Sequence, residues 1–322
     1  MNLHRPLPIL ALTLLALIPF EYVAATTPEP TRHIKLYNEG WSEPLQKYNL
    51  QILRAALNAS QEKFGPYEMS IYPEELSLDR ADAVLSEGKE INCRIDSFRP
   101  DLSKDSKFQS TPLSTHAYVM GLRAMVIRQD YHTEMMNLNS VEALLKLSPG
   151  QGFEWPEVNI YTQHGLQVKK IRRLGRILPM LERKRFDFFP LSVMEATQFL
   201  SEYKNGEHEL IVDPNHYIFY AMPQYLAYPK NQPDIEKRIT YGLKKLYDSG
   251  ELQKITASHF AYINNAFNRK AHIFVLNNPY LSPSQNDDIY NDTATQYFND
   301  GAIIHRVPSA SPSPSPSEHN GQ

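Results

Sequence analysis

The chain has 322 residues, of which 42% are hydrophobic, and its formal net charge is −3. This length and composition suffice for one large or two modest hydrophobic cores, and they exclude a fibrous or wholly disordered chain. The small negative charge gives no bulk attraction to nucleic acid, so we expect no nucleic-acid partner.

Residues 1–25 have the three parts of a secretory signal peptide. Arg5 supplies the positive charge, Leu7–Pro19 is apolar, and Val23-Ala24-Ala25 places small residues at a cleavage site. The apolar stretch is short for a membrane span, and an uncleaved anchor is the alternative. We therefore expect an exported, periplasmic protein whose mature chain begins at Thr26.

The first third of the mature chain alternates strands and helices, which predicts a parallel sheet with covering helices. The expected strands are 33–37, 67–72 and 91–98, and the expected helices are 45–63 and 76–85. Cys93, the single cysteine, lies in the third strand, where we expect a packed side chain instead of a reactive thiol.

The middle of the chain repeats this alternation between two long apolar segments, Tyr118–Arg128 and His216–Met222. The expected strands between them are 166–171, 186–191 and 209–212, and the expected helices are 141–147, 177–185 and 193–203. Two amphipathic helices, 233–248 and 252–262, follow. Because the α/β pattern occurs twice, we expect two α/β lobes.

The C-terminal end is polar. Residues 282–300 are rich in Asn, Asp and Ser, so we expect 282–308 to be a polar surface extension. Residues 309–322 contain a Ser-Pro repeat, which prevents helix and ladder hydrogen bonding. We expect this last segment to be a disordered tail.

Common enzyme motifs are absent from the sequence. It has no G-x-S-x-G, H-E-x-x-H, P-loop or Rossmann fingerprint, and its eleven histidines show no metal-ligand spacing. We therefore expect no catalytic residues, no metal and no cofactor. Acid/base enzymes need no local motif, so an exported enzyme stays open as an alternative.

Three segments carry a resemblance to a known family. They are Gly150–Val158 (GQGFEWPEV) with Gly165–Val168 (GLQV), Leu178–Glu195 (LPMLERKRFDFFPLSVME) and His272–Leu281 (HIFVLNNPYL). Through them the chain resembles the type II periplasmic solute-binding protein superfamily. It is most similar to the amino-acid-binding family 3 and its divergent branch of transporter substrate-binding domain proteins.

The resemblance implies two α/β lobes, each a mostly parallel sheet with flanking helices, and two crossing strands as the hinge. The long segments Tyr118–Arg128 and His216–Met222 would be the crossings. Lobe 1 would then be discontinuous, from 31 to 119 and from 217 to 281, and lobe 2 would be 120–216. The ligand would lie in the cleft between the lobes.

Ligands of open α/β sheets bind outside the carboxyl ends of the strands. Those ends place Glu39, Gln151, Gly152 and Ser192 at the expected cleft. The glycines of 150–152 would let backbone N–H groups approach an anion. Trp155 is either an apolar wall of the cleft or an ordinary core residue.

Amino-acid binders of this family clamp the ligand carboxylate with an arginine after the third strand. The chain departs from this pattern, since its corresponding stretch is 99–105 (RPDLSKD). Arg99 or Arg123 is our candidate for the clamp, and a structural or surface charge is the alternative for each.

We therefore expect a monomeric protein that captures a small polar solute, with amino-acid-like molecules among the candidates. Its partner would be the permease of an ABC transporter or a membrane sensor. An orphan interaction module on the same fold is a second alternative, beside the exported enzyme.

Overall fold

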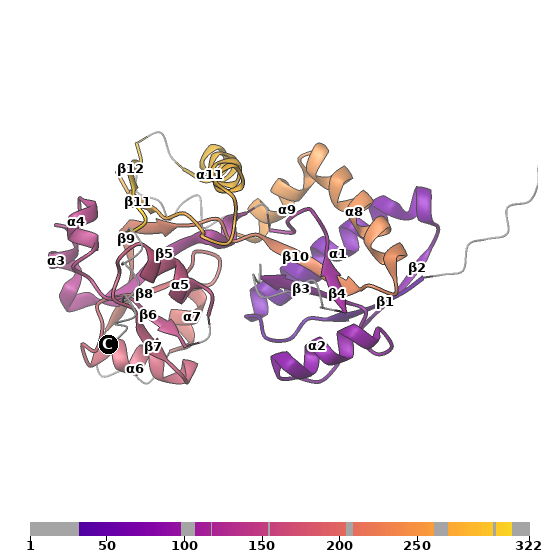
Figure 1. Ribbon diagram of the computed structural model, residues 1–322, viewed down its shortest axis with the longest axis horizontal. Coiled ribbons are helices and arrows are strands. Elements are labelled where there is room, and N and C mark those ends of the chain that lie inside the picture. Colours follow the sequence, from indigo (N-terminus) through magenta and orange to yellow (C-terminus); the bar gives the residue numbers. More distant parts are fainter. Residues whose placement is uncertain are drawn as a thin grey trace, which may run out of the picture. The chain divides into compact units, whose positions relative to one another are not determined.

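The computed structural model describes residues 32–97, 107–116, 118–153, 155–203, 209–260, 270–298 and 301–310. The expected signal peptide, Arg99 and residues 311–322 of the expected tail lie outside these residues. Within the described part, two five-stranded sheets carry covering helices (Figure 1). This arrangement confirms the expected two-lobed α/β fold.

Sheet A has the strand order β2-β1-β3-β10-β4. Its strands are β1 (Arg32–Tyr37), β2 (Tyr67–Ile71), β3 (Cys93–Ser97), β4 (Phe108–Ser110) and β10 (Gln224–Pro229). Its helices are α1 (Glu43–Phe64), α2 (Leu78–Glu87), α8 (Pro233–Asp248) and α9 (Glu251–His259). Cys93 is fully buried, and burial raises the pKa of its thiol.

The pairing in sheet A is half parallel. Strand β1 pairs parallel with β2 and β3, whereas β10 pairs antiparallel with β3 and β4. Strand β10 was not predicted from the sequence. Five of its six residues are buried, so the strand has none of the polar–apolar alternation by which a half-buried strand is detected. The expected mostly parallel sheet is thus only partly observed.

Sheet B has the order β12-β11-β9-β5-β8. Its strands are β5 (Leu122–Arg128), β8 (Phe189–Ser192), β9 (Leu210–Phe219), β11 (His272–Val275) and β12 (Ile303–Arg306). All seven residues of β5 are buried, because both faces of this inner strand are covered. Strand β5 is antiparallel to β8 and β9, and β11 is parallel to β9 and β12.

Short elements complete this part of the chain. They are η1 (Val119–Gly121), η2 (Gln129–Tyr131), α3 (His132–Met135), α4 (Val141–Leu144), β6 (Gly150–Gly152), α5 (Glu157–Gln163), β7 (Lys169–Ile171), η3 (Leu174–Arg176), α6 (Ile177–Glu182) and α7 (Ala196–Glu202). Strands β6 and β7 form a separate parallel pair.

The segments before β5 and after β9 connect the two sheets. They lie against each other, since the Tyr220 N–H donates to the Gly121 carbonyl over 3.2 Å. A Cβ on Gly121 would lie 1.8 Å from the Tyr220 carbonyl oxygen, so only glycine permits this approach. The expected crossing segments therefore run side by side.

The C-terminal region differs from the expected domain limits. His272 of β11 pairs with His216 of β9, which places 272–275 in sheet B, although the sequence analysis assigned 217–281 to the first lobe. Residues 283–297 form helix α11 (Pro283–Tyr297), and β12 adds to the edge of sheet B. A capping box starts α11: the Ser282 hydroxyl accepts from the Gln285 N–H, and the Gln285 side chain accepts from the Ser282 N–H. Helix α11 buries Ile289, Thr293 and Tyr297 at four-residue spacing. The region expected to be a polar surface extension therefore contains a packed helix, α11, and a strand, β12.

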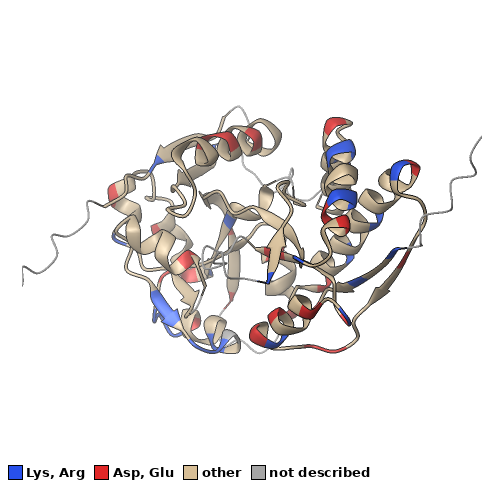
Figure 2. Ribbon diagram, turned by 45° about the vertical axis from the view of Figure 1, so that its right-hand side comes forward, with Lys and Arg blue, Asp and Glu red and all other residues tan. Residues whose placement is uncertain are grey.

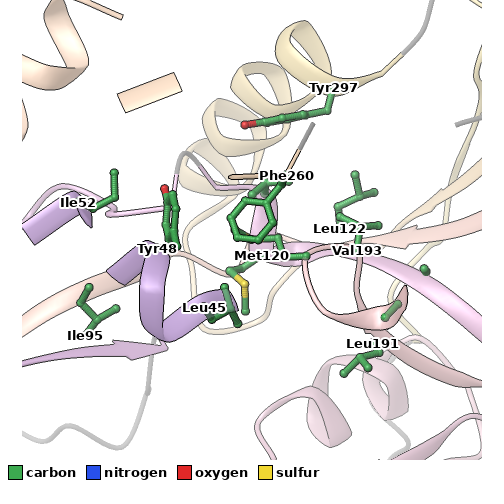
Figure 3. Close-up of a cluster of buried hydrophobic side chains, with 14 of the residues drawn as sticks. Leu45, Tyr48, Ile52, Ile95, Met120, Leu122, Leu191, Val193, Phe260 and Tyr297 are labelled. Carbon is green, nitrogen blue, oxygen red and sulfur yellow. The ribbon is translucent and has the colours of Figure 1, made fainter. Parts of the chain in front are cut away.

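Charged side chains are distributed over the helices that cover both sheets (Figure 2). Apolar side chains fill the interior, and one core cluster includes Ile95 of β3 and Leu191 of β8 (Figure 3). Tyr48 of α1 belongs to this cluster, and its hydroxyl lies 2.9 Å from the Thr115 carbonyl oxygen in the connecting segment. No helix in the described ranges has the length and apolar character that a membrane crossing requires.

Candidate functional site

A cavity of about 640 Å³ opens at the carboxyl ends of strands from both sheets. Sheet A contributes the loop 39–42 after β1, the end of β3 and part of α2. Sheet B contributes β5, β8, the start of α5 and one face of α7. Ligand sites of α/β proteins occupy this position, so the cavity is the candidate binding site.

Arg123 of β5 forms a buried ion pair at the cavity wall. Its Nη2 atom lies 3.1 Å from Oε1 of Glu157, the first residue of α5, and both side chains are less than 10% exposed. Burial by itself would lower the pKa of Arg123. The nearby Tyr220 and Glu157 have the larger combined effect and raise this pKa above the ordinary value. Arg123 therefore stays charged, and its charge is balanced by Glu157.

Arg94 of β3 is held by two carboxylates at the other wall. Its Nη2 atom lies 2.6 Å from Asp82 of α2 and 2.6 Å from Asp96, two residues further along β3. Residues i and i+2 share one face of a strand, which brings Arg94 and Asp96 together. Because two acids surround one base, this group has a formal excess of negative charge.

Helix α7 and the residue before it present two carboxylates and a ring to the cavity. Glu195, the N-cap residue of α7, lines it together with Phe199 and Glu202, and spacings of four and three residues place the three side chains on one side of the helix. Burial raises the pKa of Glu195, and the neighbouring Arg123 partly opposes this shift. Glu202 accepts a hydrogen bond from Gln198 over 2.8 Å.

Aromatic rings form an apolar wall next to these carboxylates. The ring centroids of Trp155 and Phe189 are 6.4 Å apart, and those of Phe189 and Phe199 are 6.0 Å apart. All three line the cavity. Such a wall can pack against the apolar part of a ligand or against a cation.

The cavity has an excess of acidic residues. Among the described residues that line it, two are arginines, Arg94 and Arg123, and five are acidic: Glu39, Asp96, Glu157, Glu195 and Glu202. Both arginines already pair with carboxylates. Within the described chain, Glu39, Glu195 and Glu202 have no ion pair, and they give the site a net negative charge.

Three of the expected site residues, Glu39, Arg123 and Trp155, line the cavity. Among the described residues, Gln151, Gly152 and Ser192 do not line it. Ser192 is fully buried and accepts a hydrogen bond from the Met194 N–H over 3.2 Å. Gln151 is 1% exposed. Arg99 lies outside the described residues.

The glycine segment 150–152 forms strand β6 instead of an anion-binding turn. The Gly150 N–H donates to the Phe188 carbonyl, so it is used within the fold. A Cβ on Gly152 would lie 2.6 Å from the Trp155 indole ring. The Trp155 ring therefore packs directly against Gly152, and Gly152 affects the cavity only by positioning this ring.

Arg94, Glu157 and the carboxylates at α7 were not predicted from the sequence. The spacing of Glu195, Phe199 and Glu202 is visible in the sequence and could have indicated a shared helix face. Nothing in the sequence indicates that this face meets sheet A across a cavity. In the described part of the chain, no group of three or more His, Cys, Asp or Glu residues could hold a metal ion.

No protein-family model matches the chain, and no curated protein matches it. Among solved structures, an arginine third transport system periplasmic binding protein from Legionella pneumophila matches with a TM-score of 0.51 and 11% identity. The match covers 71% of this chain and 100% of the Legionella chain.

Two further structures match less closely. The substrate binding protein of an amino acid ABC transporter has a TM-score of 0.46 and 15% identity, over 71% of this chain and 99% of that one. The L-cystine solute receptor of Neisseria gonorrhoeae has a TM-score of 0.44 and 16% identity, over 72% of this chain and 93% of that one. The two five-stranded sheets and the match to the Legionella structure show that this chain has the fold of the type II periplasmic solute-binding proteins.

Proposed function

We propose that the chain is a solute-binding protein whose inter-sheet cavity captures a small solute with a positively charged group. The observation that carries this proposal is the acidic excess of a cavity lined from both sheets. Burial makes the charged form of Glu195 unfavourable and raises its pKa, and a bound cation would relieve this cost. The binding role itself is suggested by the Legionella protein of the same fold, which is described as a transport-system binding protein.

The cavity walls suggest how the two ends of such a solute would bind. Glu195 and Glu202 would face the cation, and Trp155, Phe189 and Phe199 would cover its apolar part. Arg94 keeps its Nε and Nη1 atoms without a partner in the described structure, although the side chain is 3% exposed. A carboxylate or hydroxyl oxygen on the solute would supply an acceptor if the wall moves to meet it.

Calorimetric titration with lysine, arginine and putrescine as cations, and with glutamate and glutamine as references, tests the charge class. We expect the cations to bind and to raise the melting temperature, and glutamate to do neither. Glu195→Gln should weaken cation binding by at least ten-fold, since one charge-assisted contact contributes about 1.5–3 kcal/mol. Glu68→Gln, which removes an exposed carboxylate from β2 outside the cavity, is the matched control. Equal binding of glutamate and lysine would contradict the proposal.

The proposal includes export to the periplasm and delivery of the solute, as a monomer, to a membrane permease or a sensor. Cleavage after Ala25 is the expected route of export, since residues 1–25 have signal-peptide character. N-terminal sequencing of protein from the periplasmic fraction should begin at Thr26. A mature chain that still starts at Met1 would contradict the cleaved signal.

A further inference from the structure

The segment between Lys169 and Arg185 is far more basic than the rest of the chain. It holds eight of the 33 Lys and Arg residues and a single acid, Glu182, in a protein whose net charge is −3. All eight basic side chains are exposed. Glu182 is buried and accepts a hydrogen bond from the Tyr203 hydroxyl, so it does not screen them at the surface. We call these eight side chains the basic surface.

The basic surface is compact. Its residues lie on β7, between β7 and η3, on η3 and just beyond the end of α6, and β7 is coloured as basic in Figure 2. Helix α6 has six residues, so about 9 Å of helix separates Arg176 from Arg183. Of the eight cations, Lys184 alone has an ion pair with a residue in the described ranges, at 3.1 Å from Asp130. The other seven cations therefore have no carboxylate partner among the described residues.

An exposed aromatic side chain lies beside these cations. Phe153 follows β6, its N–H donates to the Ile171 carbonyl of β7, and its side chain is 41% exposed. The Arg172 guanidinium lies 4.2 Å from the centroid of the Phe153 ring. The surface thus combines unpaired cations with an exposed aromatic ring.

We propose that the basic surface docks on a bilayer that contains anionic phospholipid. Lipid phosphates would neutralise the unpaired cations, and the Phe153 ring would enter the headgroup region, where aromatic side chains are favoured. An acidic protein or nucleic acid would neutralise the cations equally well, but it would leave the Phe153 ring without an apolar environment. This surface is separate from the solute cavity, since none of its cations lines the cavity.

Cosedimentation of the full chain with vesicles tests the docking. Vesicles of phosphatidylcholine with about one third phosphatidylglycerol should bind the protein at ~0.01 M salt and release it near 1 M, where the screening length is about 3 Å. Pure phosphatidylcholine vesicles should not bind it. Lys169→Gln/Lys170→Gln should lower the partition coefficient roughly 25-fold, about five-fold for each cation removed.

A second pair and a matched control keep the test independent of folding. Arg183→Gln/Arg185→Gln should lower partition to a similar extent, and Phe153→Ala should lower it without changing the salt dependence. Lys237→Gln/Lys244→Gln removes the same charge from α8, where both lysines already pair with aspartates, and should bind vesicles like the unchanged protein.

Three outcomes would overturn the proposal: equal binding to both kinds of vesicle, an equal loss in the α8 control, or binding to polyaspartate or duplex DNA but not to vesicles. Cation titration of the cavity should be unaffected in every variant, which separates this test from that of the proposed function.

Discussion

Nη2 of Arg123 and Oε1 of Glu157 lie 3.1 Å apart at the wall of the cavity, and both side chains are almost fully buried. The two residues come from β5 and from the start of α5, 34 positions apart in the chain. Arg123 is the only arginine of the sheet B wall among the described lining residues, and its ion pair is with Glu157, so Glu195 and Glu202 have no ion pair of their own in the described chain.

Breaking this pair should destabilise the protein strongly. We expect Arg123→Ala to lower the free energy of unfolding by about 3–5 kcal/mol, because Glu157 would stay buried and unpaired. The double variant Arg123→Met/Glu157→Met should lose less, since no buried charge remains. Urea denaturation measures both variants. A double variant that is no more stable than Arg123→Ala would show that the unpaired charge is not the cause.

Glu195 should make stability depend on pH. Its pKa is raised by burial, so the folded protein holds its proton at pH values where the unfolded chain has lost it. The resulting stability is fully present below the ordinary glutamate pKa of 4.5 and is lost as pH rises through the folded pKa. Glu195→Gln should remove this fall from the pH–stability curve. In the unchanged protein, cation affinity should rise over the same pH range, because Glu195 becomes charged there. A pH profile unchanged by Glu195→Gln would contradict the assignment.

His116 should act in the opposite sense. It is fully buried against Tyr48 and Trp41, and burial lowers its pKa to about 3. Between the ordinary histidine pKa of 6.5 and about 3, the unfolded chain therefore binds a proton that the folded chain does not. Stability from this residue should fall as pH drops through that range. His116→Phe, which cannot take up a proton, should show a shallower fall in thermal melts over the same range.

Gly152→Ala should disturb the cavity without breaking a hydrogen bond. The new Cβ would lie 2.6 Å from the Trp155 ring, so the ring must move and solute affinity should decrease. We expect a stability loss of about 1–3 kcal/mol, typical of overpacking, with a change in intrinsic fluorescence. Gly175→Ala, where nothing lies within 4 Å, should change stability by less than about 0.5 kcal/mol. Unchanged fluorescence and affinity in Gly152→Ala would show that Trp155 does not depend on Gly152.

Local patterns determined much of the fold. The alternating strand 33–37 and the periodic helix 45–63 appear as β1 and α1, because hydrophobic periodicity and the helix-ending Gly65 are local signals. Strand β10 and the packing of α11 were not predicted. Strand β10 is buried on both faces and so shows no alternation, and α11 buries only a few apolar side chains within a polar sequence.

The sequence by itself indicated Glu39 at a strand end, Arg123 as a clamp candidate and Trp155 as a possible wall of the cleft, and it contained the spacing of Glu195, Phe199 and Glu202. Only the tertiary structure decided which of these share a cavity, because its walls come from segments up to about half the chain apart. It also decided that Arg123 pairs with Glu157 and that Gly152 supports Trp155. Distances between side chains from different strands follow from sheet pairing and burial, which no local pattern specifies.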